Sequence, residues 1–199
     1  MTKTIDYYLS LVSPYTYLGD ACLSEIAERH GATIRRKPME LGKIFPQTGG
    51  LPLPKRAPAR QAYRLIELDR WRKYRGLELN LQPKYFPAQE WPAAGMVMAA
   101  EDQGLDSGAL VNGILTAVWA EERDIAEHGT LKAIAEERGL DGKALLKAAE
   151  DEDLKAAYHA NTDAALAAGV FGAPCYVFNG ELYWGQDRLD FLDRALEDS

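Results

Sequence analysis

The sequence predicts an α/β fold whose sheet is built from the two ends of the chain. Residues 5–12 (IDYYLSLV) form an apolar run typical of a strand, and a helical pattern begins directly after it. Near the other end, predicted strands at 175–178 and 181–184 flank Asn179-Gly180, a strong short signal for a hairpin. A last helix is expected from Leu189 to about Glu197. Segments about 160 residues apart are therefore expected to meet in one sheet.

The first helix is predicted over residues 14–30, with Ser13 as its N-cap and Pro14 at its first position. A charged second strand at 33–37 is typical of an edge or a strand end. The next residues, from Pro38 to Pro54, are expected to form a long loop, which in compact domains is commonly functional or mobile.

The middle of the chain is predicted to be helical. Periodic apolar residues and helix-ending glycines indicate helices at about 58–75, 93–103, 107–122, 130–138, 142–149 and 152–168. This pattern divides the chain into two predicted parts. Residues 1–54 and 151–199 would form the sheet domain, and residues 55–150 would form an all-helical insertion.

Composition excludes several classes of function. The net charge of −7 argues against a nucleic-acid partner, and no apolar run reaches the ~18 residues of a membrane span. The N-terminus lacks the pattern of a signal peptide, so a cytoplasmic location is expected, and two Cys argue against structural disulfides. Cys22 falls on an apolar helical stripe, and three scattered His lack metal-ligand spacing, so no metal is predicted.

The charges are unevenly distributed. Residues 35–75 contain twelve of the 23 Lys and Arg and carry a net charge of +9, whereas the remainder carries −16. A local cationic segment in an acidic protein suits a small anionic substrate better than a polyanion. The alternative interpretation, a solvated helix face, is expected to hold for most of these side chains.

The residues at the start of the first helix exclude one further class. Thioredoxin-like proteins carry C-x-x-C at this point, and here Ser13-Pro14-Tyr15-Thr16 replaces both sulfurs by hydroxyls. Neither Ser13 nor Thr16 can form a disulfide, so a dithiol oxidoreductase is excluded.

Several motifs in order carry a specific resemblance. They are Ser13-Pro14-Tyr15-Thr16-Tyr17-Leu18, Ala117-Val118-Trp119 with Asp124-Ile125, Val170-Phe171-Gly172-Ala173-Pro174, and Trp184-Gly185-Gln186-Asp187-Arg188. Over nearly its whole length the chain resembles the 2-hydroxychromene-2-carboxylate isomerases, relatives of kappa-class glutathione transferases. The resemblance implies an α/β, thioredoxin-like fold with a large all-helical insertion.

The resemblance also implies an activity. In that family the sulfur of glutathione adds reversibly to the substrate, and 2-hydroxychromene-2-carboxylate and trans-o-hydroxybenzylidenepyruvate are interconverted without consuming glutathione. The reaction belongs to bacterial breakdown of aromatic compounds. Glutathione as cofactor, a small aromatic carboxylate as substrate and a homodimer are therefore expected.

Site residues are carried over by position. Ser13 matches the serine that contacts the glutathione sulfur, and the Ala173-Pro174 peptide is expected to be cis, with its backbone pairing with the tripeptide. Gln186 and Asp187 fall at the start of the last helix, where amides favour a carboxylate and Asp187 can accept from an ammonium.

The substrate's carboxylate requires a cation, and the basic segment offers Lys55, Arg56, Arg60 and Arg64. The role of Cys175, which directly follows the site proline, stays open between core packing and a mixed disulfide with glutathione.

Two other functions stay open. A kappa-like glutathione transferase or peroxidase acting on other electrophiles would use the same cofactor site, and it would consume glutathione. A non-catalytic thioredoxin-like binding protein would bind glutathione weakly and accelerate no reaction.

Overall fold

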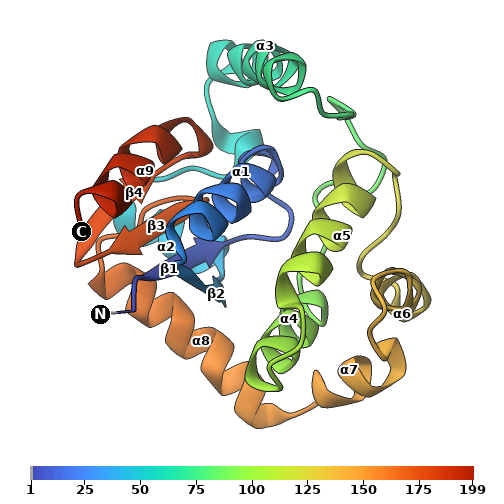
Figure 1. Ribbon diagram of the computed structural model, residues 1–199. Helices are drawn as coiled ribbons and strands as arrows, with labels where there is room; N and C mark the ends of the chain where they lie inside the picture. The colour runs from blue at the N-terminus through green and yellow to red at the C-terminus, as the bar shows by residue number, and fades with distance from the viewer. Residues whose placement is uncertain (1) are drawn as a thin grey trace.

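The computed structural model describes residues 2–199, and both ends of the chain contribute to one mixed sheet (Figure 1). The strand order is β2-β1-β3-β4, with β1 parallel to β2 and antiparallel to β3, and β3 antiparallel to β4. The strands are β1 (Thr4–Leu9), β2 (Thr33–Pro38), β3 (Cys175–Phe178) and β4 (Glu181–Trp184). The predicted meeting of the two chain ends and the edge position of the second strand are confirmed.

Helices surround the sheet and extend away from it on one side. They are α1 (Pro14–His30), α2 (Leu41–Thr48), α3 (Pro58–Arg75), α4 (Ala93–Asp102), α5 (Ser107–Trp119), α6 (His128–Glu137), α7 (Gly142–Ala148), α8 (Glu152–Ala167) and α9 (Leu189–Glu197), with short 3-10 turns η1 (Leu53–Lys55) and η2 (Gln186–Arg188). Figure 1 shows α4 to α7 grouped beside the sheet and α3 projecting at the top. None of the helices formed by residues 2–199 is long and apolar enough to cross a membrane.

The two faces of the sheet are covered by different helices. Alternate residues of a strand point to opposite faces, so Tyr7 of β1 joins the large core formed with α1, α9 and the helical segment, whereas Tyr8 faces α2 and α8. Cys175 and Tyr176 of β3 divide in the same way. The large core runs without interruption from the sheet into α4 and α5, so the helical segment packs directly on the sheet. The domain boundaries at 54/55 and 150/151 stay a prediction.

Local signals fixed α1 and the hairpin as expected. The Ser13 side chain caps α1, Pro14 is its first residue, and Gly31 ends it in a left-handed conformation with φ 60°. Asn179 and Gly180 have φ values of 50° and 82°, which the two-residue hairpin turn between β3 and β4 requires.

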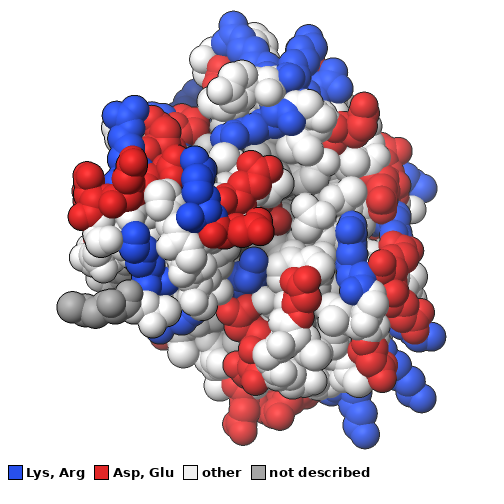
Figure 2. Space-filling model, in the orientation of Figure 1, with Lys and Arg blue, Asp and Glu red and all other residues white. Residues whose placement is uncertain are grey.

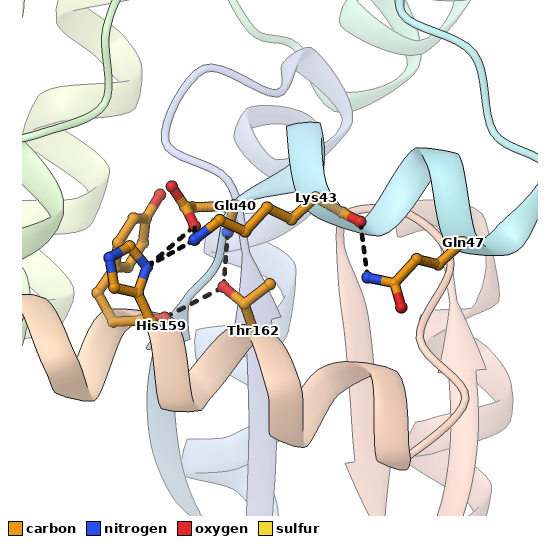
Figure 3. Close-up of polar contacts among 6 residues, drawn as sticks. Glu40, Lys43, Gln47, His159 and Thr162 are labelled. Atoms are coloured by element: carbon orange, nitrogen blue, oxygen red, sulfur yellow. Dashed lines mark hydrogen bonds and ion pairs between the residues drawn. The ribbon is translucent and has the colours of Figure 1, made fainter.

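The prediction of a long loop from Pro38 to Pro54 is wrong over about half of that segment, because the segment contains α2 and the start of η1. Pro46 lies inside α2 and the helix lacks a side-chain cap, so its sequence carried weak local signals. Contacts with α8 hold it instead (Figure 3). The Glu40 N–H donates to Thr162 Oγ1 at 3.0 Å, and His159 Nδ1 lies 3.0 Å from Glu40 Oε2, which also pairs with Lys43.

Two boundaries also differ from those predicted. The first strand ends at Leu9 instead of residue 12, because residues 10–13 turn toward α1, where the Ser13 N–H donates to Ser10 O at 3.1 Å. Helix α5 ends at Trp119, three residues early. The last helix begins at Leu189, as predicted, and Gln186 and Asp187, expected at its start, lie in the preceding turn η2.

Candidate functional site

Ser13 lies where the carboxyl end of β1 meets the start of α1. Its Oγ accepts a hydrogen bond from the Thr16 N–H at 3.3 Å, as an N-cap does, and lies 3.4 Å from the carbonyl oxygen of Ala173. The residue is 7% exposed. The hydroxyl therefore combines a structural role as a cap with a position beside the backbone of a segment 160 residues later.

The Ala173-Pro174 peptide is cis, as predicted. The Pro174 carbonyl accepts from the Gly185 N–H at 2.9 Å, which ties this peptide to the segment before η2. The Ala173 N–H forms no hydrogen bond with any of residues 2–199. A free backbone N–H beside Ser13 is the feature that an extended peptide ligand such as glutathione needs, so this part of the site fits the implied cofactor.

Gln186 and Asp187 have different surroundings although they are adjacent. Gln186 is buried, and Arg75 Nη2 of α3 donates to its carbonyl oxygen at 3.1 Å and to its Oε1 at 3.2 Å. A methyl group at Gly19 of α1 would come within 2.7 Å of the Gln186 Cβ, so η2 approaches α1 closely only because position 19 is glycine. Side-chain contacts of Gln186 thus hold η2 in place.

Asp187 is the more accessible of the two. Its side chain is 39% exposed, and its Oδ2 lies 2.5 Å from Nη1 of the neighbouring Arg188. Because the only ion pair that it forms among residues 2–199 is this exposed one, its carboxylate can accept from a ligand's ammonium.

The four predicted substrate-binding cations do not converge. Lys55 and Arg60 are exposed, while Arg56 donates to the Leu51 carbonyl at 2.8 Å and lies over the Phe45 ring. Arg64 is the exception, because it is only 8% exposed. Figure 2 shows Lys and Arg gathered over α3 on the face in view, so most of the cationic segment is solvated surface.

Tyr15 is a site residue that the sequence reasoning did not select. Burial raises the pKa of its hydroxyl, and the nearby Arg64 charge opposes that rise. The charges of Glu67, Arg56 and Asp187 act on it more weakly. Tyr15 therefore lies among α1, α3 and η2, and the only sequence signal for it was its place two residues after Ser13.

Glu90 is a second residue that was missed. Its carboxylate accepts from the Ser10 hydroxyl at 2.8 Å and from the Leu11 N–H at 2.6 Å, and so braces the turn that leads to Ser13. Burial raises the pKa of Glu90 to about 7, although both hydrogen bonds oppose the rise. No local motif signals a bond between residues 80 positions apart.

Cys175 is fully buried against the α2 and α8 side of the sheet. Burial raises the pKa of its thiol to about 12, and hydrogen bonds from the Gly172 and Phe171 amides offset this only in part. A thiol that is neutral and inaccessible packs the core, which decides between the two roles left open by the sequence. Cys22 is also a free thiol.

Comparison with known proteins shows the family of the chain. A family model described as a DSBA-like thioredoxin domain matches residues 4–197. The chain is 30% identical to a 2-hydroxychromene-2-carboxylate isomerase of Sphingobium xenophagum over the whole of both chains. It is 23% identical to glutathione S-transferase kappa 1 of Rattus norvegicus, covering 96% of this chain and 89% of that one.

A solved structure of a 2-hydroxychromene-2-carboxylate isomerase superimposes with a TM-score of 0.81 at 27% identity, covering 98% of this chain and 95% of that one. The thioredoxin-like fold expected from the sequence is therefore confirmed, and relatives named as isomerases match the chain from end to end. The chain belongs to the DSBA-like thioredoxin domain family and, within it, groups with the 2-hydroxychromene-2-carboxylate isomerases.

Proposed function

We propose that this protein is a glutathione-dependent cis–trans isomerase. Its substrate would be 2-hydroxychromene-2-carboxylate, in exchange with trans-o-hydroxybenzylidenepyruvate, or a related aromatic acid. The observation that carries the proposal is the position of the Ser13 hydroxyl, at the N-terminus of α1 and 3.4 Å from the Ala173 carbonyl beside a cis proline. The names of the full-length relatives support the same reaction class.

Bound glutathione would supply a thiolate nucleophile for reversible addition to the conjugated double bond of the substrate's open-chain form. Ser13 would donate its hydroxyl hydrogen to the sulfur, and the amide end of α1 would favour the negative charge. The backbone of Ala173 would pair with the tripeptide, and Asp187 would accept from its ammonium group. Gln186 would act through its backbone and through holding η2, since its side chain binds Arg75.

The stoichiometry of glutathione tests the reaction class. An isomerase leaves the concentration of glutathione unchanged over many turnovers of trans-o-hydroxybenzylidenepyruvate, whereas a transferase or peroxidase consumes glutathione in proportion to product. We expect glutathione to be required and not consumed. One-for-one depletion would support the kappa-like alternative, and no acceleration at saturating glutathione would support a binding protein.

Replacing Asp187 by alanine is expected to weaken glutathione binding by about 1–3 kcal/mol, because a charged hydrogen bond is lost. Isothermal titration calorimetry measures this directly. Asp190→Ala is a matched control, because Asp190 is a neighbouring exposed carboxylate at the start of α9. An affinity for glutathione that is equal in Asp187→Ala and wild type would remove Asp187 from the site.

The cytoplasmic location stays a prediction. We also propose that the protein forms a homodimer. Exposed apolar side chains on α3, among them Tyr63 at 54% and Tyr74 at 77% exposure, give a second copy surface to cover. Sedimentation at micromolar concentration is expected to give twice the mass of the 22.1 kDa chain.

A further inference from the structure

Arg64 is the only Lys or Arg among residues 2–199 that is buried. Together with Leu68, one turn further along, it makes up the buried face of α3. Its guanidinium lies 5.5 Å from the ring centroid of Phe86 and 5.7 Å from that of Trp119. Burial lowers its pKa, and the charge of Arg56 lowers it further. A buried guanidinium normally has a carboxylate partner, because an unpaired buried charge is costly.

Arg64 has no such partner within the described chain. It forms no salt bridge and no hydrogen bond with residues 2–199, although the protein contains many ion pairs elsewhere. Glu67, one turn along α3, pairs with Arg70 at 3.0 Å instead. The donors of Arg64, which lie near the Phe86 and Trp119 rings, are therefore left free for another acceptor.

The surroundings of Arg64 are aromatic. The Trp119 side chain is fully buried, and its Nε1–H has no hydrogen-bond partner among residues 2–199. The rings of Phe86 and Trp119 lie 5.0 Å apart between centroids. Tyr15 lies two residues after Ser13 at the start of α1, and the Arg64 charge is the nearby charge that most affects the pKa of its hydroxyl. A cation without a partner beside aromatic rings suits an aromatic anion.

We propose that Arg64 binds the carboxylate of the aromatic substrate, with the partly buried Phe86 and Tyr15 beside it in that subsite. The inference rests on the proposed function for the place of the subsite in a reaction, and it deepens that function by selecting one cation from four. Lys55 and Arg60 are exposed, and Arg56 donates to the Leu51 carbonyl, so none of the three is assigned to the carboxylate. The guanidinium, which lies near both rings, has donors that can bind both oxygens of one carboxylate.

Binding of simple probes tests this assignment without any turnover. We would titrate trans-cinnamate and its uncharged amide, trans-cinnamamide, into wild type, Arg64→Met and Arg60→Met, in the presence of glutathione. Arg60→Met is the matched control, because it removes a cation from the exposed face of the same helix. We expect wild type to prefer the acid and Arg64→Met to bind it about 10–100-fold more weakly, the equivalent of one charge-assisted hydrogen bond. Binding of the amide is expected to change by less than about 3-fold, and Arg60→Met to behave as wild type.

Three results would overturn the assignment. Equal losses for acid and amide would make Arg64 a packing residue. An unchanged cinnamate affinity with a weaker glutathione affinity would mean that Arg64 binds a carboxylate of glutathione. No preference of wild type for the acid over the amide would overturn it even if Arg64→Met did not fold. Arg64→Lys, which keeps the charge, should recover part of the affinity for cinnamate. Because none of these readouts uses turnover, a failure of the isomerase proposal would be seen separately, in the stoichiometry experiment.

Discussion

Replacing Ser13 by alanine is expected to lower the turnover of trans-o-hydroxybenzylidenepyruvate at saturating glutathione by more than about 10-fold. The hydroxyl lies at the start of α1 and beside the Ala173 carbonyl, where it can hold the glutathione sulfur in one position. Absorbance assays of the isomerisation rate in wild type and Ser13→Ala would measure this loss of turnover.

The expected loss is larger than the ionisation of the thiol can explain. A free thiol with a pKa of ~8.5 is about 3% ionised at pH 7, and a pKa lower by about two units would make it about 75% thiolate. That gain is about 25-fold, and the lower nucleophilicity of the more acidic thiol removes roughly 8-fold of it. Ionisation alone therefore gives only about 3-fold. Holding the sulfur at the reacting carbon must contribute the rest, because orientation can supply several kcal/mol.

A control separates this effect from the loss of a helix cap. Asp106 caps α5 through its Oδ1, which accepts from the Ala109 N–H at 2.8 Å, so Asp106→Ala removes a comparable cap away from the site. Both variants should lose about 1 kcal/mol of stability, and only Ser13→Ala should lose turnover. Wild-type turnover in Ser13→Ala would reduce Ser13 to a cap and overturn its proposed role.

Replacing Glu90 by glutamine is expected to flatten the pH dependence of stability. Burial raises the Glu90 pKa to about 7 in the folded protein, from an ordinary value of 4.5. The folded state therefore binds a proton more tightly than the unfolded chain. The resulting stabilisation is complete below about pH 4.5 and is lost as the pH rises through about 7, and it amounts to roughly 3 kcal/mol in the free energy of unfolding.

Urea denaturation between pH 4.5 and pH 8 measures this. Wild type should lose stability over that range, and Glu90→Gln should lose roughly 3 kcal/mol less. Burial raises the pKa of Asp20 to about 6, so the stability of both proteins still depends on pH below about 6. Glu150→Gln, at an exposed position, is the control and should follow wild type. If the curves of Glu90→Gln and wild type coincide, Glu90 ionises in the folded protein as it does in the unfolded chain.

Elements with strong local signals could be predicted well. The cap and proline at the start of α1, the Asn179-Gly180 turn and the apolar stripe of α5 each depend on residues within one or two turns of the chain. Helix α2 could not be predicted, because its stability depends on contacts between Glu40 and residues of α8. A helix with an internal proline and no cap has little to distinguish it locally from a loop.

The candidate site divides in the same way. Ser13 and the cis Ala173-Pro174 peptide follow from motifs, and their approach to 3.4 Å follows from the fold that those motifs indicate. The sequence could not show which of the four cations is buried. Lys55, Arg56, Arg60 and Arg64 all carry one positive charge and lie in one short segment.

The sequence by itself determined the fold family, the two chain ends that form the sheet and the serine at its carboxyl edge, because these depend on short motifs in a fixed order. Only the tertiary structure decided which polar groups are buried away from solvent. Burial separates Arg64 from Arg60, raises the pKa of Glu90 and makes Cys175 a core residue. Desolvation depends on what the rest of the chain places around a side chain, and that information lies in residues far away in the sequence.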